Sequence, residues 1–205
     1  PFKMIKVRIL NGAHTAMVPC SLLYGNKLVM ETVNGDFTGS FVNSVIGEIS
    51  ETLAMDKNEI TAYTEEVMDR FKNPFIKHAL ADIALNSISK FKVRVLPSLL
   101  GYVNSQKKLP TNLTFSLACL IQFYKGTWNN EALPVKDTPE LVEAFKKAWE
   151  LGSLDSVVAS VLANTEFWGE DLTKIEGLSE ALVVALTEIE ANGIENGFAN
   201  FSAKY

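Results

Sequence analysis

Apolar residues recur every three to four positions along most of this chain, and that spacing confines it to a mostly α-helical fold. In residues 3–24 the pattern is carried by Ile5, Ile9, Leu10, Ala13 and Met17. The same spacing predicts further helices at residues 37–54, 58–72, 77–88, 111–125, 153–163 and 178–192. We therefore predict a multi-helical domain over residues 1–205.

Proline, glycine and asparagine mark where these helices begin and end. Pro19 is predicted to kink or interrupt the first helix, and Gly25 with Asn26 to end it. Asn73-Pro74 predicts a break, whereas Thr138-Pro139 predicts the start of a helix. The last ten or so residues are predicted to form a short tail. No internal repeat or linker divides the chain, so one domain is expected.

Composition narrows the class of protein. With 47% hydrophobic and 21% charged residues the chain is typical of a well-packed globular protein. A net charge of -5 argues against a nucleic-acid partner, and no run of eighteen apolar residues predicts a membrane span. Lys3, Lys6 and Arg8 interrupt the first residues, so no signal peptide is expected there. Cys20 and Cys119 are predicted to be buried, reduced thiols, and a cytoplasmic location is expected.

Three residues of the first predicted helix point to chemistry: Lys6, Asn11 and His14. At about 100° per residue, Asn11 lies roughly 140° around an α-helix from Lys6, with His14 between them. One helical face can therefore present an amine, an amide and an imidazole to the same small substrate. This set suits proton transfer at an oxygen-bearing carbon, with the amine as base and the other two groups holding the oxygen.

A lysine acts as a base at neutral pH only if its ammonium form is destabilised. Burial does this, and we expect the apolar side chains of Ile5, Ile9 and Leu10 to shelter Lys6 from water. The simpler interpretation is a solvated lysine in the first turn of a helix.

Asn11 and Gly12 are both unfavourable in a helix interior, which suggests a constraint other than folding. In the functional interpretation Asn11 donates to the substrate oxygen, and Gly12 allows close approach of substrate or cofactor. Alternatively Asn11 caps a local carbonyl, and His14 is a structural residue. No metal is expected, because His78 is the one other histidine and no Cys/His cluster has ligand spacing.

The spacing Lys-x4-Asn-x2-His in residues 6–15 resembles the signature of the mannitol dehydrogenase family, the polyol-specific long-chain dehydrogenases. Three further blocks, at residues 70–78, 87–97 and 164–172, resemble that family in the same order. The resemblance extends from residue 1 to about residue 190. Within the family the string at 6–15 is most similar to the uronate branch, the tagaturonate reductases.

This resemblance implies a fold similar to the C-terminal helical domain of 6-phosphogluconate dehydrogenase. It implies a substrate-binding and catalytic domain, with Lys6 as general acid/base, Asn11 stabilising the reacting oxygen and His14 positioning the substrate. The reaction implied is the NAD-dependent interconversion of D-tagaturonate and D-altronate in hexuronate breakdown. The chain starts at Pro1 and contains no Gly-x-Gly-x-x-Gly, so the N-terminal Rossmann domain that would bind most of the NAD is expected to be absent. Alone, the chain is expected to be inactive.

Lys90 matches a family position near the substrate, and it would meet a uronate carboxylate. Alternatively it belongs to a solvated basic cluster with Lys92 and Arg94. Eight residues before Lys90, where polyol enzymes tend to carry arginine, this chain has Asp82. That departure disfavours mannitol-like specificity.

Other functions remain open from the sequence. A fructuronate reductase and a mannitol or mannitol-phosphate dehydrogenase are alternatives within the family. A helical protein-interaction module without chemistry is an alternative outside it. The enzyme hypothesis also predicts an exposed apolar patch beside residues 1–10, where the absent domain would dock.

Overall fold

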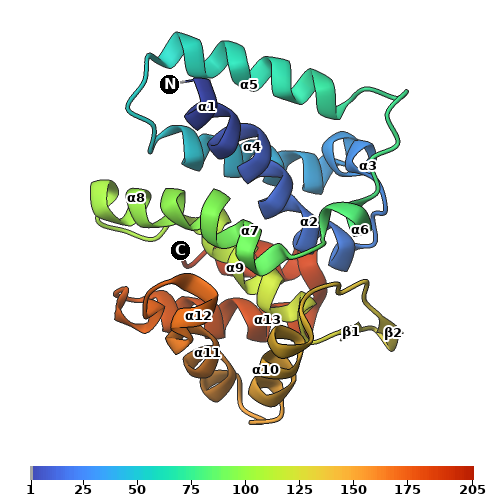
Figure 1. The fold of residues 1–205 in the computed structure, drawn as a ribbon, viewed down its shortest axis with the longest axis vertical. Coiled ribbons are helices and arrows are strands. Elements are labelled where there is room, and N and C mark those ends of the chain that lie inside the picture. Colours follow the sequence, from blue (N-terminus) through green and yellow to red (C-terminus); the bar gives the residue numbers. More distant parts are fainter. Residues whose placement is uncertain (1) are drawn as a thin grey trace.

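The computed structural model describes residues 2–205 and is mostly helical, as predicted (Figure 1). Its first half contains α1 (Phe2–Ile5), η1 (Lys6–Asn11), α2 (Gly12–Tyr24), α3 (Val29–Asn34), α4 (Asp36–Ser50), α5 (Lys57–Phe71), α6 (Leu80–Ile83) and α7 (Ser87–Arg94). Its second half contains α8 (Leu96–Gln106), α9 (Thr111–Phe123), β1 (Thr127–Trp128), β2 (Glu131–Ala132), α10 (Pro139–Trp149), α11 (Leu154–Ala163), α12 (Thr165–Trp168), η2 (Leu172–Lys174) and α13 (Leu178–Ser202). β1 and β2 form a small antiparallel hairpin.

Helix α9 is the centre of the molecule, and α2, α4 and α13 pack around it (Figure 1). Every residue from Leu113 to Phe123 is buried, which confirms the buried helix predicted there. An aromatic cluster joins these helices: the Phe198 ring lies 5.4 Å from that of Phe41 and 5.0 Å from that of Phe115. Cys20 and Cys119 are free and buried in this core, as predicted.

The first predicted helix is continuous but changes type near its start. Residues 6–11 form a π-helix, in which hydrogen bonds run between residues five apart. The Gly12 N–H accordingly reaches the carbonyl of Val7. The interruption predicted at Pro19 is wrong, because α2 continues through Pro19 to Tyr24 and ends at Gly25, whose φ is 116°.

The single helix predicted at residues 77–88 is also wrong. A loop extends to Ala79, and α6 and α7 are separated by a turn in which Asn86 adopts a left-handed conformation with φ 53°. Asn86 donates its N–H to the carbonyl of Lys136, a tertiary contact that the local sequence does not reveal. Leu80, Ala84 and Ser87 are nevertheless buried, whereas Ile83 is half-buried.

The predicted C-terminal tail is wrong as well, because α13 continues to Ser202. At Gly193 (φ 77°, ψ −173°) the helix kinks. The segment after this kink folds back so closely that a Cβ on Gly197 would lie 2.9 Å from the Glu188 carbonyl oxygen. This return buries Phe201 completely.

Other boundaries follow the predicted signals. Thr138 caps α10 by accepting a hydrogen bond from the Leu141 N–H, with Pro139 as the first helical residue. Among residues 2–205, no helix is both long enough and apolar enough to cross a bilayer.

Candidate active site

The π-helix contains the spacing that the sequence singled out. It begins at Lys6 and ends at Asn11. Because a π-helix bonds residue i to residue i+5, Asn11 lies close to one turn above Lys6, nearer in angle than an α-helix would place it. His14, three residues into the following α-helix, lies about 60° around from Asn11. The backbone therefore places all three residues on one narrow face.

Lys6 is exposed on that face. The predicted shelter from Ile5, Ile9 and Leu10 is wrong, because Ile5 and Ile9 point into the core and Leu10 is only half-buried. Within residues 2–205 the ammonium of Lys6 thus remains in contact with water.

Asn11 and Gly12 have different surroundings from those expected. The half-buried Asn11 side chain makes no hydrogen bond within residues 2–205, so local capping does not explain it. Gly12 instead packs closely against α7: a Cβ there would lie 3.1 Å from the Arg94 carbonyl oxygen. The space that was predicted to admit a ligand is therefore occupied by the end of α7.

The half-buried side chain of His14, on α2, packs against the end of α5. Its ring centroid lies 4.3 Å from that of Phe71 and 6.1 Å from that of His78. Three causes together lower the pKa of His14 to about 4: burial, which is the largest, then the charges of His78 and Arg94. The imidazole is therefore neutral at pH 7, and its buried Nε2 has no hydrogen-bond partner within the described chain. A neutral ring can both donate to and accept from a hydroxyl-rich substrate.

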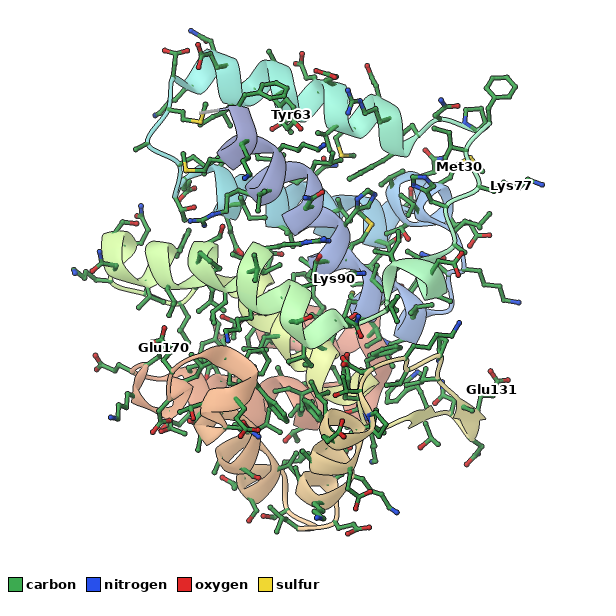
Figure 2. All side chains as sticks on the ribbon, viewed as in Figure 1. Met30, Tyr63, Lys77, Lys90, Glu131 and Glu170 are labelled. Atoms are coloured by element: carbon green, nitrogen blue, oxygen red, sulfur yellow. The ribbon has the colours of Figure 1, made fainter. Side chains whose placement is uncertain are left out.

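Lys90 is held in place rather than freely solvated. Its Nζ donates a hydrogen bond to the Ile83 carbonyl oxygen over 2.8 Å. Ile83 is the last residue of α6. Because a turn follows it, its carbonyl oxygen accepts no hydrogen bond from a later residue of the same helix. Burial, followed by the charge of Arg94, lowers the pKa of Lys90. Figure 2 shows Lys90 near the middle of the molecule, where α7 lies beside α2.

Sequence reasoning grouped Arg94 with Lys90 and Lys92 as a solvated basic cluster and did not place Arg94 or His78 beside His14. Arg94 follows Lys90 by four residues on α7, a spacing that places both on one side of a helix and was visible in the sequence. His78 is 64 positions from His14, and their proximity depends on the loop after α5. That loop is tied to α3, since the Val29 N–H donates to the His78 carbonyl over 3.0 Å.

Three cationic side chains of this region form no ion pair within residues 2–205. Although the chain carries a net charge of -5, Lys6, Lys90 and Arg94 lie around α2 and α7. The ion pairs found among residues 2–205 are Arg70–Glu66 and Lys125–Glu190, and neither involves these three cations. The arrangement can bind an anion or the oxygens of a polar substrate. It brings no three His, Cys, Asp or Glu side chains together as a metal site.

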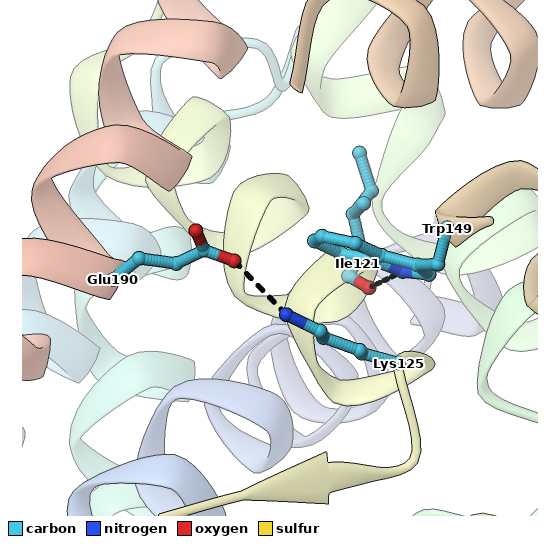
Figure 3. Close-up of polar contacts among 4 residues, drawn as sticks. All are labelled: Ile121, Lys125, Trp149 and Glu190. Carbon is cyan, nitrogen blue, oxygen red and sulfur yellow. Dashed lines mark hydrogen bonds and ion pairs between the residues drawn. The ribbon is translucent and has the colours of Figure 1, made fainter. Parts of the chain in front are cut away.

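Two other features lie apart from this region. A cavity of about 500 Å³ is lined by Lys125, Glu190 and the hairpin, and it contains none of the predicted site residues. There the Lys125 Nζ lies 3.2 Å from the Glu190 carboxylate and 4.7 Å from the ring centroid of Trp149 (Figure 3). Near the N-terminus Phe2 and Met4 are exposed by 72% and 43%, in the area predicted to carry an apolar patch. Pro1 lies outside the described residues.

The fold defines the class of this chain. It matches the structure of Pseudomonas fluorescens mannitol 2-dehydrogenase in a ternary complex with NAD and D-mannitol, with a TM-score of 0.87 at 20% identity, over 100% of this chain and 41% of that one. A D-sorbitol dehydrogenase in substrate-free form matches with a TM-score of 0.79 at 15% identity, over 96% of this chain and 40% of that one. The model of the mannitol dehydrogenase C-terminal domain matches residues 1–190. The chain therefore belongs to the mannitol dehydrogenase family, as its sequence predicted.

Its sequence relatives point to one branch of the family. The altronate oxidoreductase of Bacillus subtilis (strain 168) is 41% identical over 204 residues, which cover 98% of this chain and 41% of that protein. The altronate oxidoreductase of Yersinia enterocolitica is 39% identical over 208 residues, which cover 98% of this chain and 43% of that protein. This chain thus spans about two fifths of the length of the relatives it matches.

Proposed function

We propose that this chain is the substrate-binding and proton-transfer part of an NAD-dependent dehydrogenase that interconverts D-tagaturonate and D-altronate. The observation that supports this most is the set of relatives named altronate oxidoreductase, similar over 98% of this chain at about 40% identity. The solved mannitol 2-dehydrogenase has the same fold but only 20% identity, which favours the uronate substrate over mannitol.

The proposed chemistry divides between this chain and a second domain. Residues 2–205 form no parallel sheet of the kind that binds a dinucleotide, so a separate N-terminal domain would hold most of the NAD. NAD, when bound, supplies the hydride acceptor. During altronate oxidation the Lys6 Nζ takes the proton from the reacting hydroxyl, while the Asn11 amide donates to that oxygen.

The remaining residues position the substrate. The neutral His14 imidazole orients the hydroxyl-bearing chain, and Lys90 contributes a cation from α7. Because Lys6 is exposed within residues 2–205, the docked dinucleotide-binding domain would have to cover it and lower its basicity. The proposal therefore requires that the chain alone shows no turnover.

The test uses the full-length protein that contains this chain. NADH oxidation is measured with D-tagaturonate, D-fructuronate and D-fructose, and D-tagaturonate is expected to give the highest kcat/KM. Lys6→Ala is expected to lower kcat by about 10²–10⁴-fold. Lys3→Ala, at an exposed lysine one turn earlier, is the control and is expected to retain activity. Undiminished activity of Lys6→Ala would refute the role of Lys6 as the base. A higher kcat/KM with fructuronate or fructose would assign the enzyme to another branch of the family.

A further inference from the structure

We propose that Arg94, together with Lys90, binds the carboxylate of the substrate and makes the enzyme prefer acid sugars to neutral polyols. This inference rests on the proposed function and adds a residue that determines its specificity. The sequence resemblance gave a place near the substrate to Lys90 alone among the basic residues of α7.

The geometry of α7 separates its basic residues into two groups. Phe91 and Val95 are fully buried and define the face toward the core. Lys90 and Arg94 are one turn apart on one flank of that face, and Lys92 lies about 200° around the helix from each. The Lys92 side chain instead reaches Gly169, where a Cβ would lie 3.0 Å from its Cε.

The flank that carries Lys90 and Arg94 borders the candidate active site. Helix α7 packs against both α2 and the π-helix. At the closest approach the Arg94 carbonyl oxygen lies 3.1 Å from the Cβ position of Gly12, the residue between Asn11 and His14. This contact brings α7 against the helix that carries Asn11 and His14, and the charge of Arg94 is close enough to His14 to contribute to the lowering of its pKa.

The positive charge of this flank favours the binding of an anion. Arg94 and Lys90 are both half-buried, and no carboxylate of residues 2–205 forms an ion pair with either. Two partly desolvated cations one turn apart repel each other, and an anion placed between them removes this cost. The lowered pKa values of Lys90 and His14, to which Arg94 contributes, agree with such an uncompensated positive region.

The two side chains differ in what they can offer a carboxylate. Lys90 already donates to the Ile83 carbonyl, which leaves two of its three donors. The Arg94 guanidinium can bind both carboxylate oxygens at once, and no hydrogen bond within residues 2–205 uses it. Arg94 is therefore the stronger determinant of the two.

The first test compares charged and neutral substrates with the full-length enzyme. Arg94→Gln is expected to raise KM for D-tagaturonate by about 10- to 100-fold, the effect of losing a hydrogen bond to a charged group. The kcat should change little, and turnover of D-tagatose, which lacks the carboxylate, should be unaffected. Arg94→Lys should recover part of the loss. Lys92→Gln removes a charge from the other flank of α7 and should leave KM unchanged.

The second test needs no turnover. The chain contains two histidines, and His14 lies beside the proposed site. Titration with D-altronate, followed by NMR of the His14 ring, should show saturable shifts that neutral altritol does not produce and that Arg94→Gln abolishes.

These tests separate the two proposals. If the wild type reduces D-tagaturonate and Arg94→Gln keeps its KM, the role of Arg94 is overturned and the proposed function stands. If the full-length protein reduces no uronate but D-altronate binds in an Arg94-dependent manner, the site assignment stands and the proposed function fails. Equal losses for charged and neutral substrates would show that Arg94→Gln only perturbs the fold, which also overturns the inference.

Discussion

Acidification is expected to weaken the fold of this chain through the single side chain of His14. Its pKa in the folded state is lowered to about 4 by burial, then by His78 and Arg94, whereas an unfolded histidine titrates near 6.5. Between these values the unfolded chain binds a proton that the folded chain does not. The free energy of unfolding must therefore fall as the pH falls from about 6.5 toward 4.

The size of the effect follows from the two pKa values. A difference of one pKa unit corresponds to about 1.4 kcal/mol. Relative to pH 8, a pKa of about 4 in the folded state predicts a loss of about 2 kcal/mol at pH 5 and about 3 kcal/mol at pH 4. For a protein of this size, the loss at pH 5 lowers Tm by about 4–8 °C.

The assay is urea unfolding of the wild type and of His14→Gln at several pH values between 8 and 4.5. Other groups also titrate in this range, so the relevant quantity is the difference between the two proteins. The wild type should lose about 2 kcal/mol more than the variant by pH 5. His78→Gln is the matched control and should keep most of the wild-type dependence, because burial is the largest cause of the lowered pKa of His14.

Identical pH dependence of the wild type and His14→Gln would refute this reasoning. So would an NMR titration of the folded chain in which the His14 ring protonates near 6.5. Either result would mean that His14 is solvated, and the neutral imidazole proposed for substrate binding would lose its physical basis.

Three further substitutions test the packing of the fold and of α7 against α2. Glu48→Gln should cost about 1–3 kcal/mol in urea unfolding, because the Glu48 carboxylate accepts 2.8 Å hydrogen bonds from the Asn112 and Leu113 N–H groups at the start of α9. Phe201→Ala should cost about 3–5 kcal/mol, since this side chain is fully buried; a cost below 1 kcal/mol would mean that the end of α13 is a tail after all. Gly12→Ala should change stability little, because better helix propensity offsets the 3.1 Å contact with α7, but it should raise KM up to about tenfold by displacing that helix. An unchanged KM for this variant would show that the position of α7 does not affect substrate binding.

The helices were predictable where a repeating pattern of apolar residues defines them. The buried helix at 111–125 and the start at Thr138-Pro139 follow from local spacing and capping. The prediction was wrong where distant contacts outweigh local preference. Asn86 bonds to the carbonyl of Lys136, a partner that the local sequence does not reveal. The helix predicted at 178–192 does stop at Gly193, but the following segment forms another helical stretch that folds back on Glu188.

For the candidate site, the sequence by itself determined which chemical groups are present and that Lys6, Asn11 and His14 share one region of a helix. It also flagged Asn11-Gly12 as unfavourable for an ordinary helix, and the π-helix ends there. Only the tertiary structure decided their surroundings, because burial and charge depend on residues far away in the chain. Packing of α7 and the loop after α5 against α2 makes His14 neutral. The spacing of Lys90 and Arg94 on α7 is local, but only the tertiary structure decides that neither has a carboxylate partner.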